Sequence, residues 1–361
     1  MTKIPPLSPP TPMDYQQLST MIKEWASALG FQQTGITDTD LSQYEERFMQ
    51  WLAKGFHGTM DYMHKHGIKR LRPDELIPGT LRIISVRMDY LPPDTGMFET
   101  LNDPQKGYIA RYALGRDYHR LMRKRITLLA RKISDLIGPF GYRAFCDSAP
   151  VLEKPIAEKA GLGWIGKHTN VINSKAGSWF FLGEIYTDIP LAIDPPTAKS
   201  HCGSCTACID ICPTKAIVGP YQLDASRCVS YLTIELRGTI PLELRPLIRN
   251  RIFGCDDCQL ICPWNKFAKT TQEKEFHPRH QLAFPELLTL FYWTEDEFLK
   301  YTEGSAIRRI GYECWLRNIA VALGNAPADP SIVSALKAQL LRHSSPMLLE
   351  HIEWALQRQL T

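Results

Sequence analysis

The sequence predicts an α+β protein of several domains, because three different patterns follow one another along the chain. Helical and strand patterns alternate up to about residue 190, cysteines crowd residues 191–270, and helical patterns fill 271–361. A length of 361 residues suits about two or three domains. We therefore expect an N-terminal α/β sandwich over 14–190, a cysteine-rich domain over 191–270 and an all-α C-terminal domain over 271–361.

The first domain is expected to alternate helices and strands. Apolar residues at helical spacing predict a helix over 15–29, which Gly30 would end. Asp40 and Gln43 resemble a capping box and predict the start of a second helix. Further elements are a long helix over 117–137 and three strands, expected at 81–88, 142–146 and 178–186.

The predicted helix over 117–137 is strongly basic. The basic residues in it and directly before it are Arg116, Arg120, Arg123, Lys124, Arg125, Arg131 and Lys132. Such a run is most often a solvated face, and contact with a nucleic acid is the alternative.

The cysteine-rich stretch carries the most specific signal. Cys202 begins a C-x2-C-x2-C-x3-C-P run, which is the spacing of bacterial ferredoxins. A second run, Cys255 to Pro263, lacks its first cysteine, and Cys228 is the natural substitute. In such modules the last cysteine of each run ligates the other cluster.

Exchanging the final cysteines gives two complete ligand sets. The first set is Cys202, Cys205, Cys208 and Cys262, and the second set is Cys212, Cys228, Cys255 and Cys258. Paired C-x2-C motifs can also bind zinc, but two C-P endings in this order favour two 4Fe–4S clusters. Cys146 and Cys314 are left over and are expected to be buried as small apolar side chains. A two-cluster module inside a much longer chain suggests that its electrons are used in the same polypeptide.

The C-terminal part is expected to be helical. Helical patterns cover 305–323, 331–341 and 346–360, with Gly324 and Asn325 ending the first. Short connections between such helices resemble a HEAT-like unit.

Composition and charge restrict the class of protein. Apolar residues make up 44% of the chain and charged residues 22%, which excludes a wholly disordered chain. The net charge of +4 is small, so a polyanionic partner would have to meet a local basic patch. No apolar run reaches the ~18 residues of a membrane-spanning helix, and the proline-rich extension over 1–13 lacks the apolar segment of a signal peptide. We expect a cytoplasmic protein without a membrane partner, and nothing demands more than a monomer.

Asp147 is a candidate catalytic residue because it directly follows a predicted strand. A carboxylic acid at the end of a strand could donate a proton, although an N-cap role is equally consistent with its position. The nearest match to a corrinoid-ligating D-x-H-x-x-G motif is Asp117-Tyr118-His119, which lacks the glycine. We expect His119 to be a surface or helix-packing residue.

Taken together, these segments resemble the epoxyqueuosine reductase family, whose members are cobalamin- and iron–sulfur-dependent enzymes of tRNA queuosine synthesis. The resemblance extends over nearly the whole chain from about residue 14. The segments that carry it are the cysteine-rich stretch and residues 35–41, 110–119, 147–168, 228–238, 254–265 and 303–326. It implies the last step of queuosine synthesis, in which the epoxide of epoxyqueuosine at the tRNA wobble position is reduced with two electrons and two protons, and water leaves.

The resemblance also implies roles for individual residues. Asp147 matches the proton-donor position, and cobalamin would lie in the first domain without a histidine lower ligand. The implied cobalamin-binding positions are Arg70, Ala110, Asp147, Lys154, Val171, Ser230 and Asp256. Arg237 and C-terminal arginines would contact the tRNA. The cluster on the first cysteine set would lie nearer the cobalt, and the other would receive electrons from a flavodoxin- or ferredoxin-type one-electron donor.

Two other functions remain possible at this point. A corrinoid reductase of small molecules, resembling the reductive dehalogenases, would use the same electron route but usually carries an export signal. A simple electron carrier would hold the clusters without a corrin.

Overall fold

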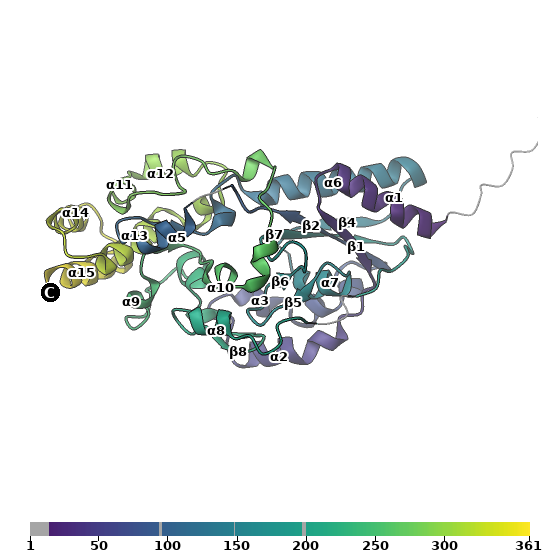
Figure 1. Cartoon of the computed structure of the whole chain (residues 1–361), viewed down its shortest axis with the longest axis horizontal. Coiled ribbons are helices and arrows are strands. Elements are labelled where there is room, and N and C mark those ends of the chain that lie inside the picture. Colours follow the sequence, from purple (N-terminus) through teal and green to yellow (C-terminus); the bar gives the residue numbers. More distant parts are fainter. Residues whose placement is uncertain (1–13, 94–95, 148, 197–199) are drawn as a thin grey trace, which may run out of the picture.

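A four-stranded antiparallel sheet organises the N-terminal part of the computed structural model, which describes residues 14–93, 96–147, 149–196 and 200–361. The strand order is β1 (Gln33–Thr37), β2 (Arg82–Asp89), β7 (Phe180–Thr187) and β4 (Tyr142–Phe145). The three strands expected from the sequence are thus present, and β1 is an additional one. Figure 1 shows the sheet at one end of an elongated molecule and the C-terminal helices at the other.

Helices cover both faces of this sheet. On one face, α1 (Tyr15–Ala28) and α6 (Tyr118–Ile137) pack with the core that contains Ile84, Val86 and Ile185. On the other face, α7 (Glu153–Lys159) packs against Ile83 and Tyr186. The period-2 alternation of strand side chains explains why adjacent residues of one strand enter different cores.

Both long helices have the ends that the sequence predicts. Asp14 caps α1, which stops where Gly30 takes a φ of +89°. Asp117 caps α6 by accepting a hydrogen bond from the His119 backbone N–H at 3.1 Å.

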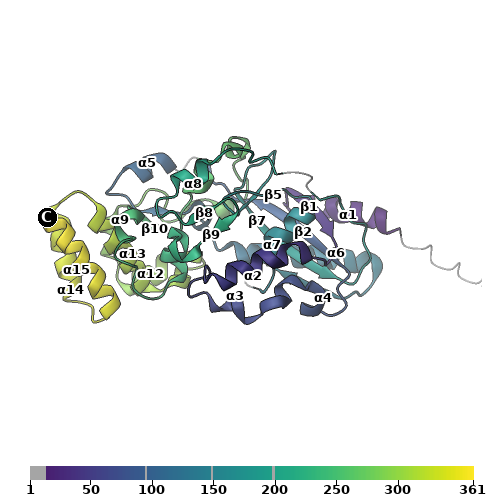
Figure 2. The same cartoon turned by 90° about the horizontal axis from the view of Figure 1, so that it is seen from below.

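The capping box expected at Asp40 does not form the start of a helix. Asp40 Oδ1 accepts from the Ser42 backbone N–H at 2.9 Å, which makes an Asx-type turn. A 3₁₀ turn over Ser42–Tyr44 follows, and only then does α2 (Glu45–Ala53) begin. Two short helices, α3 (Asp61–Lys65) and α4 (Pro73–Leu76), complete this side, as Figure 2 shows.

One segment from the N-terminal part packs with the rest of the chain. Beyond α5 (Met97–Asn102), β3 (Tyr108–Ile109) pairs in parallel with β10 (Arg251–Phe253). Ile109 lies in the same core as Trp315. The hydrophobic cores therefore cross residues 190 and 270, and the division into three domains stays a prediction.

The cysteine-rich part consists of short elements joined by loops. It contains α8 (Ala207–Ile211), α9 (Arg245–Ile248), α10 (Asp257–Leu260) and the small hairpin of β8 (Ile217–Gly219) and β9 (Gln222–Leu223). A second hairpin, β5 (Trp164–Ile165) with β6 (Val171–Ile172), belongs to the glycine-rich stretch before it. Helices α8 and α10 pack against each other.

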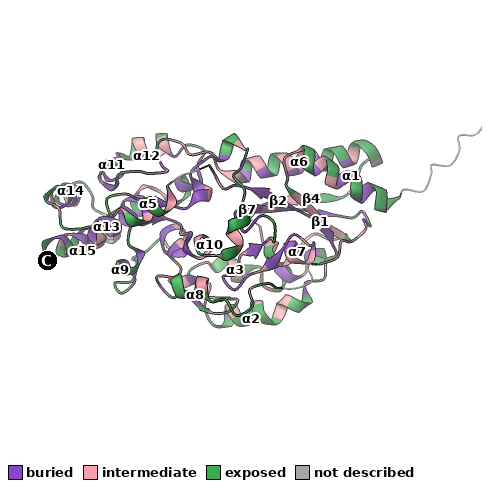
Figure 3. Ribbon diagram, in the orientation of Figure 1, coloured by how far each residue is buried: buried purple, intermediate pink, exposed green. Residues whose placement is uncertain are grey.

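The C-terminal part is helical, as expected. It comprises α11 (Leu287–Phe291), α12 (Glu295–Tyr301), α13 (Tyr312–Asn325), α14 (Pro330–Leu340) and α15 (Pro346–Leu360). The single helix expected over 305–323 is broken at Gly311, whose φ is +77°, into a 3₁₀ turn and α13. Figure 3 shows α13 as the buried helix of this group. No helix in the described part of the chain is both long and apolar enough to cross a membrane.

Candidate active site

Asp147 lies at the end of β4, where the chain leaves the sheet. Its φ of +58° places a non-glycine residue in the left-handed region, which is uncommon. The backbone N–H of Asp147 donates to Glu153 Oε1 at 2.5 Å and holds this conformation. The Asp147 side chain is 55% exposed, so its carboxyl group is accessible from solvent.

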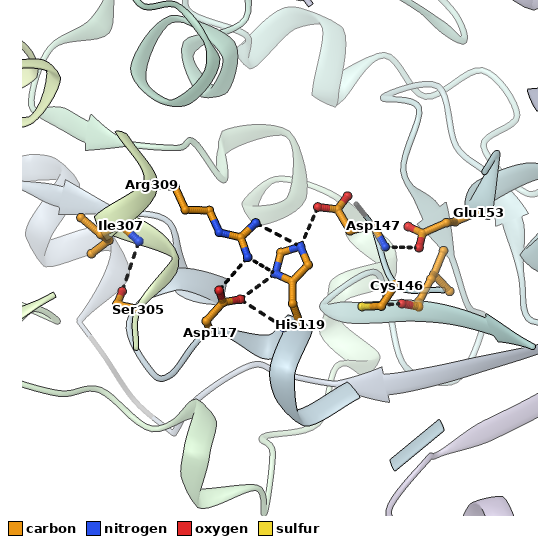
Figure 4. Close-up of polar contacts among 9 residues, drawn as sticks. Asp117, His119, Cys146, Asp147, Glu153, Ser305, Ile307 and Arg309 are labelled. Carbon is orange, nitrogen blue, oxygen red and sulfur yellow. Dashed lines mark hydrogen bonds and ion pairs between the residues drawn. The ribbon is translucent and has the colours of Figure 1, made fainter. Parts of the chain in front are cut away.

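Three charged side chains extend from Asp147 to the C-terminal part of the chain (Figure 4). His119 Nε2 lies 2.9 Å from Asp147 Oδ2, and His119 Nδ1 lies 2.6 Å from Asp117 Oδ1. Arg309 donates to Asp117 Oδ2 at 2.7 Å. The start of α6 and the 3₁₀ turn before α13 are thereby joined at the proposed proton donor.

These contacts change the acidity of the groups. Burial acts to raise the pKa of Asp147, but the hydrogen bond from His119 prevails and lowers it below its usual value. Burial acts to lower the pKa of His119, whereas its bonds to Asp117 and Asp147 raise it. Burial acts to raise the pKa of Asp117 as well, but its hydrogen bond from His119 lowers this pKa to about 2. Both shifts favour the form of the pair in which the proton is on His119 and Asp147 is ionised.

A buried pair of glutamates lies beneath Asp147. Strand register places Glu184 of β7 opposite Phe145 and Ser85, so its side chain lies on the α7 face below the Asp147 backbone. Glu184 is 0% exposed, and burial followed by the nearby Glu153 raises its pKa. Burial and then Asp147 raise the pKa of Glu153 to about 7. At least one proton therefore resides on this pair at neutral pH.

The glutamate pair predicts how stability depends on pH. Because the folded-state pKa of Glu153 is raised from 4.5 to about 7, its contribution to stability is complete below 4.5 and is lost as pH rises through about 7. Glu184→Gln removes one of the two acids, so we expect the fall in melting temperature between about pH 5 and 8 to become shallower than in the wild-type protein. Thermal denaturation followed by circular dichroism measures this. An unchanged slope would mean that the pair does not titrate as described.

Asp256 lies on the side of the site formed by the cysteine-rich part. It is 2% exposed and accepts hydrogen bonds from the Tyr108 hydroxyl and the Arg111 backbone N–H, both at 2.8 Å. Burial, and then the carboxylates of Asp147 and Asp256, raise the pKa of Tyr112 far above its ordinary value. The Tyr112 ring lies 6.2 Å from that of Tyr118, which stacks on His119, and 6.1 Å from that of Phe253. Tyr112 therefore lies between the elements that carry Asp147 and Asp256.

Ala110 is packed closely between these elements. It is 0% exposed, and its backbone N–H donates to the Phe253 carbonyl at 2.8 Å. A Cβ on Gly254 would stand 2.6 Å from the Ala110 Cβ. Small residues at both positions let β3 and the loop that carries Asp256 approach closely.

Arg70 comes to the same region from the segment after α3. Its guanidinium is buried and donates to the Tyr62 carbonyl at 2.6 Å, while its Nε has no hydrogen-bond partner in the described structure. Burial, then Glu235 and Asp147, raise the pKa of Tyr62 to about 12. A buried cation with an unused donor can bind a polar ligand group.

Of the other residues expected at the site, Lys154 is an exposed residue of α7. Its Nζ donates to Asn170 Oδ1 at 3.3 Å. Burial lowers its pKa, while the thiol of Cys258 and the carboxyl group of Glu153 act to raise it. Val171 is buried in β6 and Ser230 is half-buried near Cys228.

The eight clustered cysteines separate into two groups in space. The thiols of Cys202, Cys205 and Cys262 interact electrostatically with that of Cys208, and those of Cys212, Cys228 and Cys258 interact with one another. Cys255 interacts with Cys228, and Cys258 also interacts with Cys208 of the other group, so the two groups adjoin each other. These groups have the same membership as the first and second ligand sets. All ten cysteines are free thiols, and the two left over, Cys146 and Cys314, are buried.

The expected order, in which the first set lies nearer the site, stays a prediction, but the second set has the closer contacts with residues expected there. Lys154 interacts with Cys258 and Cys228 of the second set, and Asp256 directly follows Cys255. The first set instead lines a cavity of about 340 Å³ together with His201, Trp264 and Phe267. Phe267 is 41% exposed, which places this cavity at the surface. The loop of the second set therefore lies against β3, with which β10 pairs.

Four thiols can hold either a zinc ion or a 4Fe–4S cluster. Within the described ranges, no three His, Cys, Asp or Glu side chains converge closely enough to hold one metal ion. Zinc requires four ligands at about 2.0–2.3 Å from one point. A 4Fe–4S cluster has its iron atoms at separate corners, so its four cysteines stand further apart. The choice between clusters and zinc rests on the cysteine pattern of the sequence.

The structure gives His119 and Arg237 contacts that were not expected from the sequence. His119, expected to pack or to lie at the surface, is buried and contacts Asp147. Arg237 is exposed but donates to the backbone carbonyls of Ile310 and Arg309 at 2.7 and 3.0 Å, so part of its guanidinium holds the turn that carries Arg309.

Some of the basic side chains on α6 and directly before it form ion pairs with acidic residues. Arg116 forms an ion pair with Glu275 at 2.9 Å, and Arg125 pairs with Glu273. Arg120, Lys124 and Arg131 are exposed on the side away from the sheet.

Comparison with known proteins gives consistent similarity along the chain. Residues 201–265 match a family model described as "4Fe-4S double cluster binding domain", and residues 70–148 match one described as "Epoxyqueuosine reductase QueG, DUF1730". The epoxyqueuosine reductase of Pseudomonas aeruginosa is 61% identical over 352 residues, which cover 98% of this chain and 96% of that protein. The enzyme of Escherichia coli K12 is 58% identical, with 97% of this chain and 91% of that protein covered.

Solved structures share the fold. An epoxyqueuosine reductase from Bacillus subtilis, whose aspartate-containing catalytic loop is swung out of the active site, has 28% identity and a TM-score of 0.86 over 96% of this chain and 91% of that chain. Another was solved with a tRNA-Tyr epoxyqueuosine-modified stem loop, and has 26% identity and a TM-score of 0.83 over 96% of this chain and 100% of that chain.

Proposed function

This chain belongs to the epoxyqueuosine reductase family, an enzyme family of oxidoreductases, and from that membership we propose that it reduces epoxyqueuosine to queuosine at the wobble position of tRNA. The observation that carries the proposal is the placement of Asp147 and Asp256 around one region, beside the second cysteine set. An acid and a source of electrons are the two things that removal of an epoxide oxygen requires. This would be the last step of queuosine synthesis.

We assign the eight clustered cysteines to two 4Fe–4S clusters, in agreement with the double cluster family model. Cys202, Cys205, Cys208 and Cys262 would hold one, and Cys212, Cys228, Cys255 and Cys258 the other. The first set lies at the surface and would receive electrons from an external one-electron donor of flavodoxin or ferredoxin type. The second set would pass them to the site around Asp147.

The residues around the site fit cobalamin. The buried guanidinium of Arg70 has an unused donor, Lys154 offers an ammonium group, and Ala110 is a small side chain beside Asp256. Arg70, Ala110, Asp147, Lys154, Val171, Ser230 and Asp256 would surround the cofactor. Cobalamin would supply a strongly reducing cobalt centre for cleavage of the C–O bonds.

Side chains of the protein would supply and direct the proton that the epoxide oxygen needs. Asp147, accessible from solvent and bonded to His119, would donate a proton to the epoxide oxygen as its C–O bond breaks. Because an alkoxide is a poor leaving group, this proton lowers the barrier. Glu153 would hold the Asp147 backbone in the orientation that presents the carboxyl group.

The tRNA would have to bring its anticodon loop to this region. An unpaired wobble nucleoside can be splayed out of its stack and inserted into a pocket. Arg237 and the neighbouring Arg308 and Arg309 would provide positive charge for the phosphates, with affinity that falls as salt rises. Monomeric action in the cytoplasm is our working proposal.

The experiment that tests the proposal is mass spectrometry of tRNA nucleosides. Anaerobically prepared protein with reconstituted clusters and cobalamin, a chemical reductant and tRNA that contains epoxyqueuosine should yield queuosine, one oxygen lighter. Unchanged epoxyqueuosine, with clusters and cobalamin bound, would refute the proposal and favour an electron carrier or a reductase of another substrate.

A further inference from the structure

The proposed reaction uses two protons at one place, whereas a carboxylic acid carries one. Conversion of an epoxide to an alkene breaks two C–O bonds and releases the oxygen as water, so Asp147 would have to be protonated again before the reaction ends. The side chain in contact with Asp147 Oδ2 is that of His119, whose Nε2 lies 2.9 Å away. His119 is 5% exposed, so its ring is shielded from bulk water.

Two carboxylates hold the ring of His119 from opposite sides. Nδ1 lies 2.6 Å from Asp117 Oδ1 and Nε2 lies 2.9 Å from Asp147 Oδ2. A neutral imidazole has only one N–H. Both contacts are hydrogen bonds only when a second proton is present, either on the ring or on a carboxyl group. The two contacts therefore require one proton between His119 Nε2 and Asp147 Oδ2, in addition to the proton between His119 Nδ1 and Asp117 Oδ1.

The charges that face His119 favour its imidazolium form. Arg309 brings a positive charge within 3.0 Å of Nδ1 and 3.3 Å of Nε2, but it is itself bonded to Asp117 Oδ2 at 2.7 Å. Asp117 and Asp147 supply two negative charges, which balance the two cations. Burial disfavours the imidazolium, and the carboxylates outweigh it, so that the pKa of His119 is raised.

The remaining neighbours add no positive charge. The ring of Tyr118 stacks on the imidazole with centroids 4.0 Å apart, and burial keeps this phenol neutral by raising its pKa. Glu153, behind the Asp147 backbone, can contribute only negative charge, and so can its partner Glu184.

We propose that His119 is a proton-relay residue that reprotonates Asp147 between the two protonation events of the reaction. This inference rests on the proposed function, in which Asp147 is the proton donor. His119 acts through Asp147 and does not contact the substrate, and Asp117 and Arg309 position its ring.

The reaction consumes two protons and two electrons, and each of them has a source in this arrangement. At rest the pair holds one proton, on His119 Nε2. Asp147 takes the first reaction proton from solvent, to which its carboxyl group is accessible, and gives it to the epoxide oxygen as the first C–O bond breaks. His119 Nε2 then gives its proton to Asp147 Oδ2 and becomes neutral, still donating from Nδ1 to Asp117. Asp147 gives this second proton as the other C–O bond breaks and water leaves. The external one-electron donor supplies the two electrons, and solvent restores the proton on His119 after turnover.

The test is the pH profile of the single-turnover rate in His119→Gln, measured on holoenzyme with tRNA that contains epoxyqueuosine. Glutamine retains a hydrogen-bond donor but cannot carry the proton. We expect the rate to fall about 10- to 100-fold, with the decline toward high pH beginning at lower pH than in the wild-type enzyme. Iron content and tRNA affinity should be unchanged. His343→Gln, a histidine that contacts Gln339 near the C-terminus, is the matched control and should match the wild type.

Two further variants make the result decisive. Asp117→Asn retains the shape of the site but removes a charge that favours the imidazolium, so it should also shift the decline to lower pH. Imidazole added to His119→Gly should restore part of the rate. Wild-type profiles in both His119→Gln and Asp117→Asn would overturn the relay. If Asp147→Asn is inactive while these profiles are unchanged, only the relay fails, whereas a fully active Asp147→Asn would refute the donor role on which it rests.

Discussion

Asp147→Asn is expected to reduce the rate of queuosine formation by about 10²- to 10⁴-fold, the range of a lost general acid. Asparagine has nearly the same shape and can still bond to His119, but it cannot give a proton to the epoxide oxygen. The Asp147 carboxyl group is accessible from solvent and has two hydrogen-bonded neighbours, His119 at 2.9 Å and the side chain of Tyr118. Single-turnover assays with nucleoside mass spectrometry measure the effect.

The controls for this variant separate chemistry from assembly. Iron, sulfide and cobalamin contents and the dissociation constant for tRNA should equal those of the wild-type protein, because Asp147 holds no iron. Asp188→Asn is a matched exchange at the far end of β7, where Asp188 accepts from the Gly141 backbone N–H at 2.9 Å, and it should remain active. Full activity of Asp147→Asn would show that the proton comes from another group.

Cys258→Ala is expected to remove one cluster and to abolish turnover. Cys258 belongs to the second set, interacts with Cys228 and Cys212, and is the thiol that Lys154 faces. With one of its four ligands missing, this cluster should be lost or become labile, and iron content should fall toward half. Without it, electrons would have no route from the surface cluster to the site. Iron analysis and electron paramagnetic resonance of the reduced protein check both statements.

A buried cysteine outside the two sets provides the comparison. Cys314 lies in α13 within the C-terminal core, and Cys314→Ala should retain the full iron content and activity. A Cys258→Ala protein with the full iron content and normal turnover would contradict the assignment of the second set.

The sequence could predict those features that depend on residues close together in the chain. The cysteine spacings define two sets because a cluster is bound largely by consecutive turns of one segment. The strands at 81–88, 142–146 and 178–186 and the last two helices have strong periodic patterns, and the structure contains them. Gly311 interrupts a helix that the apolar pattern alone would continue, since its positive φ ends the preceding turn.

What the sequence could not predict depends on contacts between distant segments. His119 and Asp147 are 28 positions apart, and Arg309 is 190 positions from His119. No local pattern indicates that these side chains meet, so His119 reads as a packing residue. The packing of the second cysteine set against β3 could not be predicted for the same reason. It is decided by the pairing of β3 with β10, two strands of two and three residues that carry little periodicity.

The central claim is that two iron–sulfur clusters within this chain supply electrons to the site around Asp147. Metal and sulfide analysis of anaerobically purified wild-type protein tests it most directly. The account predicts about eight irons and about eight acid-labile sulfides per chain, as two 4Fe–4S clusters require. Protein that instead contained stoichiometric zinc and no sulfide would contradict it, because it would have no means of carrying electrons to the epoxide.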